Sequence, residues 1–343
     1  MVNVWRKSSL TASLTLLSYF LWANIVLGLP QEPLLTRFEF TQPQMGTLFR
    51  IVCYASDAVA AERASSAAFD RIAELDHIMS DYSPNSELTL LCQQSGGPPT
   101  KVSEDLFYVL SRSQKMARLS EGAFDVTVGP LVRLWRRARR RQELPDPTRL
   151  AQALELVGVD KLRLDEKSRT VQLLRKGMVL DLGGIAKGYA ADEALKLLDQ
   201  HGIDKALVAA GGDIAVSGSP PGSDGWNIGI APLESRETPP TKYLQLHDAA
   251  VSTSGDAEQF VEIGGKRYSH IVDPKTGLGL IGHSSVTVVA PKGIVSDSLA
   301  TAVNVLGPKR GLELIDSMEG TAALILQATA DGVRAYCSKR WKD

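Results

Sequence analysis

Residues 181–189 have the sequence DLGGIAKGY, and this short stretch is the best guide to the fold and to what the chain binds. A short apolar strand is predicted from Met178 to Leu182, paired glycines follow it, and a helix is predicted from Tyr189 to Leu198. Glycines at a strand-to-helix turn let backbone N–H groups approach a ligand closely, and a helix N-terminus favours anions. Lys187 adds a mobile cation that suits a phosphate. The alternative is a tight turn without a ligand, in which glycine supplies a positive φ.

The overall composition is that of an ordinary globular protein. The chain has 343 residues, 44% of them hydrophobic, and Lys+Arg 38 against Asp+Glu 39 gives a net charge of −1. That balance argues against general nucleic-acid binding. The length allows one or two domains. We predict a single domain over residues 30–343, preceded by a distinct segment over residues 1–29.

The N-terminal segment has the pattern of an export signal. Arg6 and Lys7 precede an almost uncharged run from Ser8 to Leu29, which Pro30 ends. A basic region followed by an apolar stretch is typical of a signal peptide. The run is also long enough to span a bilayer as a signal anchor, which takes roughly 20 apolar residues. The pattern predicts export and leaves cleavage and anchoring as alternatives.

The cysteines do not indicate a metal site. Cys53, Cys92 and Cys337 form no C-x-x-C pair, which argues against zinc. An exported protein could join two of them in a disulfide. We favour three buried thiols, because free cysteine is usually a core residue.

The rest of the chain mixes strands and helices without regular β-α-β alternation, which favours the α+β class. Hydrophobic spacing predicts a helix from Ala58 to Met79, and Ser103 is a predicted N-cap of a second helix that ends near Leu119. The run Val126-Thr127-Val128 has β character.

Between Arg133 and Arg141 lie six arginines in nine residues. We favour a solvated helix end for them, with contact to anionic lipid or to an acidic partner as the alternative.

A helix predicted from Ser296 to Leu306 carries the second group of candidate residues. Asp297 and Thr301 are four apart, so their side chains lie on one face of the helix. A carboxylate and a hydroxyl, with a backbone carbonyl from elsewhere, form the oxygen shell that magnesium prefers. The alternative is that Asp297 lies in the first turn and only complements the helix dipole.

The third group surrounds His270. A predicted strand delivers this histidine and then breaks at Asp273-Pro274, a position suited to proton transfer. No role is assigned to the other histidines, which are His77, His201, His247 and His283.

Taken together, these segments resemble the ApbE family of FAD:protein FMN transferases over roughly Phe38 to Ala328. The matching elements occur in family order. They are Met45-Gly46-Thr47, Tyr82-Ser83 with Ser86-Glu87-Leu88, residues 122–130, Asp181 to Tyr189, Gly211-Gly212-Asp213, Thr253-Ser254-Gly255-Asp256, Ser269 to Gly277, and Asp297 to Thr301. The resemblance implies a mixed α+β fold with antiparallel-rich sheets, packed helices and an FAD site in a central cleft.

The resemblance also implies a role for each matching residue. His270 and Asp297 would be catalytic, with His270 beside the pyrophosphate as the acid–base group. The metal ligands would be the carbonyl of Gly184, Asp297 and Thr301, holding Mg²⁺. The residues that would contact FAD are Met45, Tyr82, Ala123, Phe124, Asp125, Asp181, Lys187 and Val272.

The implied reaction moves FMN from FAD to a threonine or serine hydroxyl of an acceptor flavoprotein and releases AMP. The resemblance also implies a periplasmic enzyme, soluble or held at the inner membrane, with an electron-transfer subunit there as a candidate acceptor. Two features depart from the family pattern: no lipid-attachment cysteine follows the signal, and the arginine run after Pro130-Leu131 replaces more neutral sequence.

Other functions are compatible with parts of this pattern. An exported FAD pyrophosphatase, which would give FMN and AMP, is the closest alternative, and sequence does not separate it from the transferase. A non-catalytic FAD-binding protein would lack the metal ligands and His270. An oxidoreductase with bound FAD would need a G-x-G-x-x-G turn, and Gly183, Gly184 and Gly188 do not have that spacing.

Overall fold

The computed structural model describes residues 34–233, 239–240, 242–257 and 259–342. The chain divides into two units, Met1–Leu34 and Leu35–Asp343, and the fold described below is that of the second. The predicted signal segment lies outside the described residues. Within them, no helix is long and apolar enough to cross a membrane.

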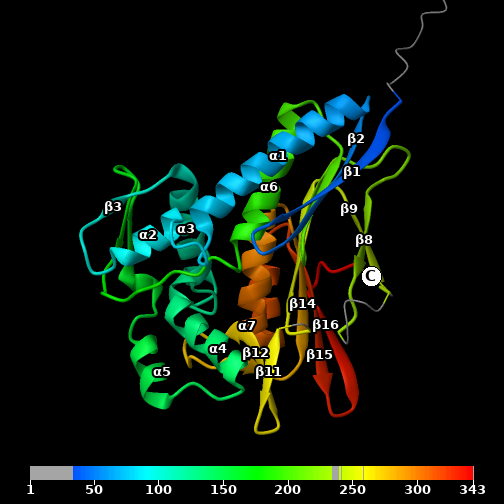
Figure 1. Ribbon diagram of the computed structural model, residues 1–343. Helices are drawn as coiled ribbons and strands as arrows, with labels where there is room; N and C mark the ends of the chain where they lie inside the picture. The colour runs from blue at the N-terminus through cyan, green and yellow to red at the C-terminus, as the bar shows by residue number, and fades with distance from the viewer. Residues whose placement is uncertain (1–33, 234–238, 241, 258, 343) are drawn as a thin grey trace, which may run out of the picture. The chain divides into compact units, whose positions relative to one another are not determined.

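An eight-stranded sheet, antiparallel at every pairing, forms the centre of the unit (Figure 1). Its strands in spatial order are β1 (Thr36–Gln44), β2 (Thr47–Ala55), β6 (Ala206–Ala210), β7 (Asp213–Ser217), β10 (Ala249–Gly255), β14 (Ser284–Ala290), β15 (Ala322–Thr329) and β16 (Gly332–Cys337). Tight turns at Met45-Gly46 and Gly211-Gly212 join β1 to β2 and β6 to β7, and Met45, Gly46 and Gly211 have positive φ. Such turns match the twist of antiparallel strands.

Three helices cover one face of this sheet: α1 (Ala58–Met79), α6 (Ala186–Gln200) and α7 (Gly293–Ser317) (Figure 1). Ile51 of β2 and Leu299 of α7 belong to the large core between helices and sheet. Val52, which follows Ile51 on β2, belongs to a second apolar cluster. This change of side follows from the two-residue period of a strand. A hairpin of β8 (Trp226–Ile230) and β9 (Lys242–Leu246) contributes Trp226 to that second cluster.

The remaining elements pack beside the helical layer. A small sheet has the order β3 (Thr100–Lys101), β5 (Thr170–Leu173), β4 (Leu162–Asp165), and another has β11 (Phe260–Ile263), β12 (Lys266–Val272), β13 (Gly279–Ile281). The helices here are α2 (Glu87–Gln93), α3 (Glu104–Leu119), α4 (Gly129–Arg141) and α5 (Pro147–Leu154), with 3₁₀ turns at Val126–Val128 and Val159–Lys161. Trp135 of α4 is buried against Tyr268 and Val272 of β12 and so fixes α4 on this sheet.

Several predictions are confirmed. The α+β class holds, α1 has the predicted bounds, and Ser103 caps α3 by accepting a hydrogen bond from the N–H of Leu106 at 3.2 Å. The helix after the paired glycines forms but begins three residues early, at Ala186.

Other predictions were wrong. Met178 to Leu182 is not a strand: the N–H of Asp181 donates to the carbonyl of Val126 at 2.8 Å instead of joining a ladder. Val126–Val128 is a 3₁₀ turn, because Asp125 caps it. Helix α7 begins at Gly293, so Asp297 lies beyond its first turn and the dipole interpretation fails.

The cysteine prediction holds only in part. No disulfide joins any two of Cys53, Cys92 and Cys337, all of which lie within the described residues. Cys53 and Cys92 are buried as predicted, but Cys337 is exposed at the end of β16.

Candidate active site

The first turn of α6 lies against α7, and two glycines allow this close crossing. A Cβ on Gly188 would collide with the carbonyl oxygen of Gly293 and would lie 2.8 Å from Cβ of Asp297. The N–H of Gly188 donates to Oδ2 of Asp297 at 3.1 Å. Asp297 is therefore held at the N-terminus of α6, where the helix dipole favours a negative charge.

Gly184 and Thr301 are neighbours at the same place. A Cβ on Gly184 would lie 2.8 Å from Oγ1 of Thr301 and 3.5 Å from the ring of Phe124. Asp297 and Thr301 lie one turn apart on α7. The structure thus gathers Gly184, Asp297 and Thr301, the predicted metal-binding group, with Phe124 beside them.

Charges concentrate around Asp297. Lys187 forms an ion pair with Asp213, which opens β7 and is almost fully buried. Burial and the negative charge of Asp213 raise the pKa of Asp297 to about 7, while Lys187 and the Gly188 hydrogen bond act in the opposite direction. Among the described residues, the Gly188 N–H is the only hydrogen-bond donor to this carboxylate. A nearby cation would stabilise the ionised form of such a buried carboxylate and lower its pKa.

Arg136 of α4 connects two of the predicted FAD contacts. Its guanidinium carbon lies 4.4 Å from the ring centroid of Tyr82, and its Nη2 donates to Oδ2 of Asp181 at 3.3 Å. Its Nη1 donates to Asp81 at 2.5 Å. Burial and the charge of Asp81 raise the pKa of Asp181, and the Gly183 amide and Arg136 oppose this rise. Tyr82 is otherwise exposed, so its ring is accessible to a flat ligand.

His270 is held by its neighbour on the adjacent segment. The backbone carbonyl of Gln259 accepts from the N–H of His270 at 2.9 Å and lies 3.0 Å from its Nδ1. A carbonyl only accepts, so Nδ1 carries the proton and Nε2 has the free lone pair. Burial lowers the pKa of His270, and the positive charges of Arg139 and Lys187 act in the same direction. The neutral imidazole is therefore favoured.

The segment Ala123-Phe124-Asp125 is buried and largely occupied by local hydrogen bonds. Oδ1 of Asp125 accepts from the N–H of Thr127 at 2.8 Å and from its hydroxyl at 2.7 Å. Burial raises the pKa of Asp125, and these bonds oppose it. The N–H of Phe124 donates to Oγ of Ser120 at 3.0 Å. The Asp125 carboxylate thus caps a turn. A ligand at this segment would therefore meet mainly backbone groups rather than a free carboxylate.

Two other predicted contacts, Met45 and Val272, lie in the β1–β2 turn and at the end of β12. Met45 occupies the β1–β2 turn, and its N–H donates to Oδ2 of Asp76 at 3.2 Å. Thr47, the first residue of β2, lies beside the turn that leads to Asp213: a Cβ on Gly211 would lie 3.2 Å from Oγ1 of Thr47. Val272 ends β12 and is packed in the apolar cluster around Trp135. The described contacts do not join Met45 or Val272 to the metal-binding group.

A family model for the ApbE family matches residues 45–325. The chain belongs to the ApbE family. The match covers the first turn of α6, the α7 residues and His270, so the predicted site lies within the ApbE region.

Relatives in this family have similar length and fold. An FAD:protein FMN transferase of Treponema pallidum is 34% identical over 307 residues, which are 84% of this chain and 84% of that protein. One from Salmonella typhimurium is 30% identical over 305 residues, 87% of this chain and 86% of that protein. The solved flavin transferase ApbE of Vibrio cholerae superposes with a TM-score of 0.80 at 29% identity, covering 89% of this chain and 98% of that one.

Two residues of the candidate site were not predicted from the sequence. Asp213, quoted only as part of a glycine motif, pairs with Lys187, and Arg136, assigned to a solvated helix end, bridges Asp181 and Tyr82. A carboxylate directly after a glycine turn was the available signal for Asp213. For Arg136 the signal was its place on the helix, one position from the buried Trp135.

No group of three His, Cys, Asp or Glu side chains that could hold a metal occurs among the described residues of this ApbE-family chain. The candidate metal group is of another kind, with one carboxylate, one hydroxyl and one backbone carbonyl. That set consists of hard oxygen donors, which fits magnesium better than zinc.

Proposed function

We propose that this chain is an Mg²⁺-dependent FAD:protein FMN transferase. The observation that carries the proposal is the convergence of the first turn of α6 with Asp297 and Thr301 of α7. A cation-bearing, glycine-lined helix N-terminus suits a pyrophosphate, and the oxygen donors beside it suit a divalent ion. Relatives that match over more than four-fifths of their length are FAD:protein FMN transferases, which supports the same activity.

The metal group and the FAD contacts have separate tasks in this proposal. The carbonyl of Gly184, with Asp297 and Thr301, would hold Mg²⁺, which when bound offsets negative charge on the pyrophosphate. Lys187 adds a second positive charge from α6. Tyr82 offers a ring face to the flat part of FAD, and Asp181 lies close enough to share Arg136 with it.

The chemical step is a displacement at the FMN phosphorus. The oxygen of an acceptor threonine or serine forms the new P–O bond, the pyrophosphate P–O bond breaks, and AMP leaves with that electron pair. Nε2 of His270 takes the hydroxyl proton, since Nδ1 is committed to Gln259. Water in place of the hydroxyl would give FMN and AMP, which is the pyrophosphatase alternative.

Mass spectrometry tests the proposal directly. The full chain is incubated with FAD, Mg²⁺ and a candidate acceptor domain, with the acceptor's threonine replaced by valine as a control. We expect the acceptor to gain one FMN as AMP appears in equal amount. Free FMN and AMP without a heavier acceptor would establish the pyrophosphatase, and no AMP at all would leave only an FAD-binding protein.

Chelation and substitution test the metal group. Asp297→Asn and EDTA are each expected to abolish both AMP release and FMN transfer, whereas Asp331→Asn, in the exposed β15–β16 turn, should leave both unchanged. Turnover that survives in Asp297→Asn at ordinary Mg²⁺ concentration would refute the assignment of this residue.

We also propose that the chain is exported to the periplasm, on the strength of the basic and apolar pattern over residues 1–29. Cell fractionation with N-terminal mass analysis distinguishes the outcomes. A soluble periplasmic form that lacks residues 1–29 indicates cleavage, an intact membrane-bound form indicates an anchor, and a cytoplasmic form overturns export.

A further inference from the structure

Helix α4 forms a rim along the candidate active site. Arg136 reaches Tyr82 and Asp181 from this helix. One turn further on, Nη1 of Arg139 donates to Oε1 of Gln259 at 3.1 Å, and the carbonyl of Gln259 holds His270. The inner side of α4 therefore extends from the predicted FAD contacts to the predicted general base.

The outer side of the same helix carries charges of one sign. Arg133, Arg137 and Arg140 are spaced three and four apart, so they share one face, and all are exposed. Among the described residues none of these three forms an ion pair or a side-chain hydrogen bond. Leu131 and Trp135 on the opposite face are buried, which keeps the helix firmly in place.

This concentration is unusual for the chain. Helix α4 has six arginines and no acidic residue, although the whole protein has a net charge of −1. Like charges on one helix face repel each other, so the arrangement costs stability when nothing neutralises it. Arginine binds carboxylates in a two-pronged geometry, which makes such a face well suited to an acidic protein surface.

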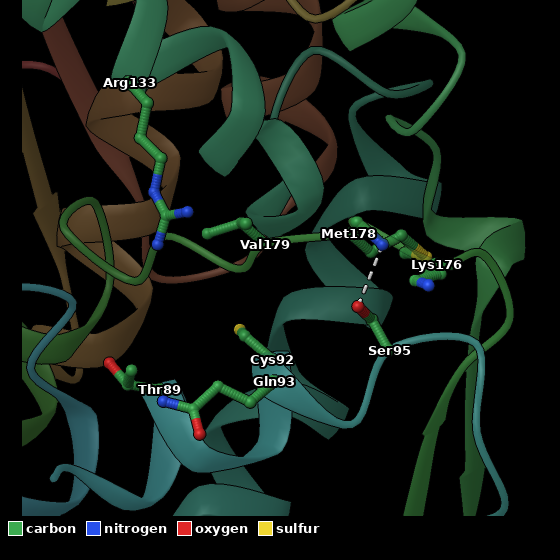
Figure 2. A pocket seen from close by; sticks show the side chains of 9 residues that line it. Thr89, Cys92, Gln93, Ser95, Arg133, Lys176, Met178 and Val179 are labelled. Atoms are coloured by element: carbon green, nitrogen blue, oxygen red, sulfur yellow. Dashed lines mark hydrogen bonds between the residues drawn. The ribbon is translucent and has the colours of Figure 1, made fainter. Parts of the chain in front are cut away.

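A pocket beside the helix extends the positive surface. It has a volume of about 500 Å³, and Arg133 and Lys176 contribute the charges of its lining, which contains no carboxylate. Figure 2 shows Arg133 extending from α4 towards Thr89, Cys92 and Gln93 on α2, with Val179 between the two helices. An acidic side chain of a partner that entered this pocket would meet two cations and no carboxylate in its lining.

We propose that the outer face of α4, with Arg133, Arg137 and Arg140, docks an acidic surface of the acceptor protein. This inference rests on the proposed transferase function. The acceptor is a protein, so when its hydroxyl enters the site, the surface around that hydroxyl lies against the rim formed by α4. An anionic bilayer would account for the charge, but it gives no reason for the charge to line the site.

Two peptides measure the docking surface without knowledge of the acceptor. Fluorescein-labelled (Glu-Thr)₈ and its uncharged counterpart (Gln-Thr)₈ are titrated with the full chain at low salt, and anisotropy is followed. We expect the acidic peptide to bind at least tenfold more tightly than the neutral one, with affinity that falls as salt rises. The triple variant Arg133→Gln/Arg137→Gln/Arg140→Gln should lose that preference.

A matched variant controls for total charge. Arg63→Gln/Lys309→Gln/Arg334→Gln removes three exposed cations from α1, α7 and β16, and it should bind the acidic peptide as the unmodified chain does. Equal loss in both triple variants, or no loss in the α4 variant, overturns the proposal. Binding to phosphatidylglycerol vesicles in preference to the peptide overturns it in favour of a membrane surface.

AMP release from FAD without acceptor separates this inference from the function on which it rests. The α4 variant should keep its FAD affinity and most of this basal release, because none of the three arginines forms a hydrogen bond or an ion pair with a residue of the candidate site, although Arg133 is close enough to lower the pKa of Asp181. Peptide binding that depends on α4 in a chain that releases no AMP would sink the transferase and keep the docking surface. AMP release by a chain whose peptide binding does not depend on α4 would refute the docking surface alone.

Discussion

The N–H of Gly188 donates to Oδ2 of Asp297 across 3.1 Å, and this bond ties the first turn of α6 to the second turn of α7. It exists only because the two helices cross at Gly188 and Gly293. The position of the candidate metal ligand therefore depends on the absence of a side chain at both Gly188 and Gly293. Glycine serves here for close approach of two backbones, a use distinct from its positive φ.

Gly188→Ala tests that dependence. The added methyl group would collide with the carbonyl of Gly293, so the helices have to separate. Overpacking of this kind costs about 1–3 kcal/mol. We expect the free energy of unfolding, measured in urea, to fall by that amount, and the Mg²⁺ concentration for half-maximal AMP release to rise. Gly183→Ala is the milder control, since its methyl group would meet only a carboxylate oxygen of Asp181, at 3.0 Å. Equal stability of both variants would contradict a close crossing that depends on Gly188.

Arg136→Gln tests the link between Tyr82 and Asp181. The variant removes the cation over the ring and the shared partner of two carboxylates. We expect FAD affinity, measured by flavin fluorescence, to fall about tenfold, which corresponds to one lost charged contact. Arg136→Lys should recover little, because lysine lacks the planar fork. Arg137→Gln, one residue along and exposed, should bind FAD normally. An unchanged affinity in Arg136→Gln would show that the residue only stabilises α4.

The elements that sequence predicted well are those whose signals are local. Helix α1 has apolar residues at helical spacing and a cap at Asp57, so its bounds follow from neighbours in the chain. Where a side chain competes with the backbone, the local pattern misled. Val126–Val128 has β character, but Asp125 binds the N–H and hydroxyl of Thr127 and closes a 3₁₀ turn instead.

The candidate site shows the same division. Its candidate residues could be named from the sequence because each motif is contiguous, and the pair Asp297 and Thr301 because a helix has a fixed period. Arg136 and Asp181 are 45 positions apart, and Lys187 and Asp213 are 26 apart. Such pairs are set by how α4, α6 and β7 pack, which no local pattern encodes.

Asp256→Asn tests whether the Thr253–Asp256 motif is structural. Burial alone would raise the pKa of Asp256, but hydrogen bonds from Arg267, His283 and the Ser284 N–H outweigh it and hold the pKa low. A lowered pKa in the folded state means that the stabilisation is present above the unfolded pKa and is lost as pH falls through the folded one. We expect the variant to be about 3 kcal/mol less stable near pH 7, because Arg267 loses its buried partner.

Urea unfolding across pH supplies the measurement for Asp256→Asn. The gap between variant and unmodified protein should narrow as the pH falls below about 4, the ordinary pKa of an aspartate in the unfolded chain, and approaches the lower pKa of Asp256 in the folded state. Asp331→Asn, at an exposed turn, is the control and should show no gap. A gap of constant size at all pH values would mean that the charge of Asp256 is not what stabilises the fold.

The pH profile of FMN transfer tests His270 as the base. Burial lowers its pKa from 6.5, so the imidazole is neutral at pH 7 and accepts a proton at Nε2. At saturating Mg²⁺, which keeps Asp297 ionised, we expect the rate to rise with pH to a plateau by about pH 7, with a midpoint below the ordinary value of 6.5. Arg139→Gln removes a positive charge near the ring, so its midpoint should move to higher pH. His270→Asn should slow transfer about 10²–10⁴-fold and abolish the acid limb, whereas His247→Asn, at an exposed position, should change neither. An acid limb that persists in His270→Asn would assign the proton transfer to another group.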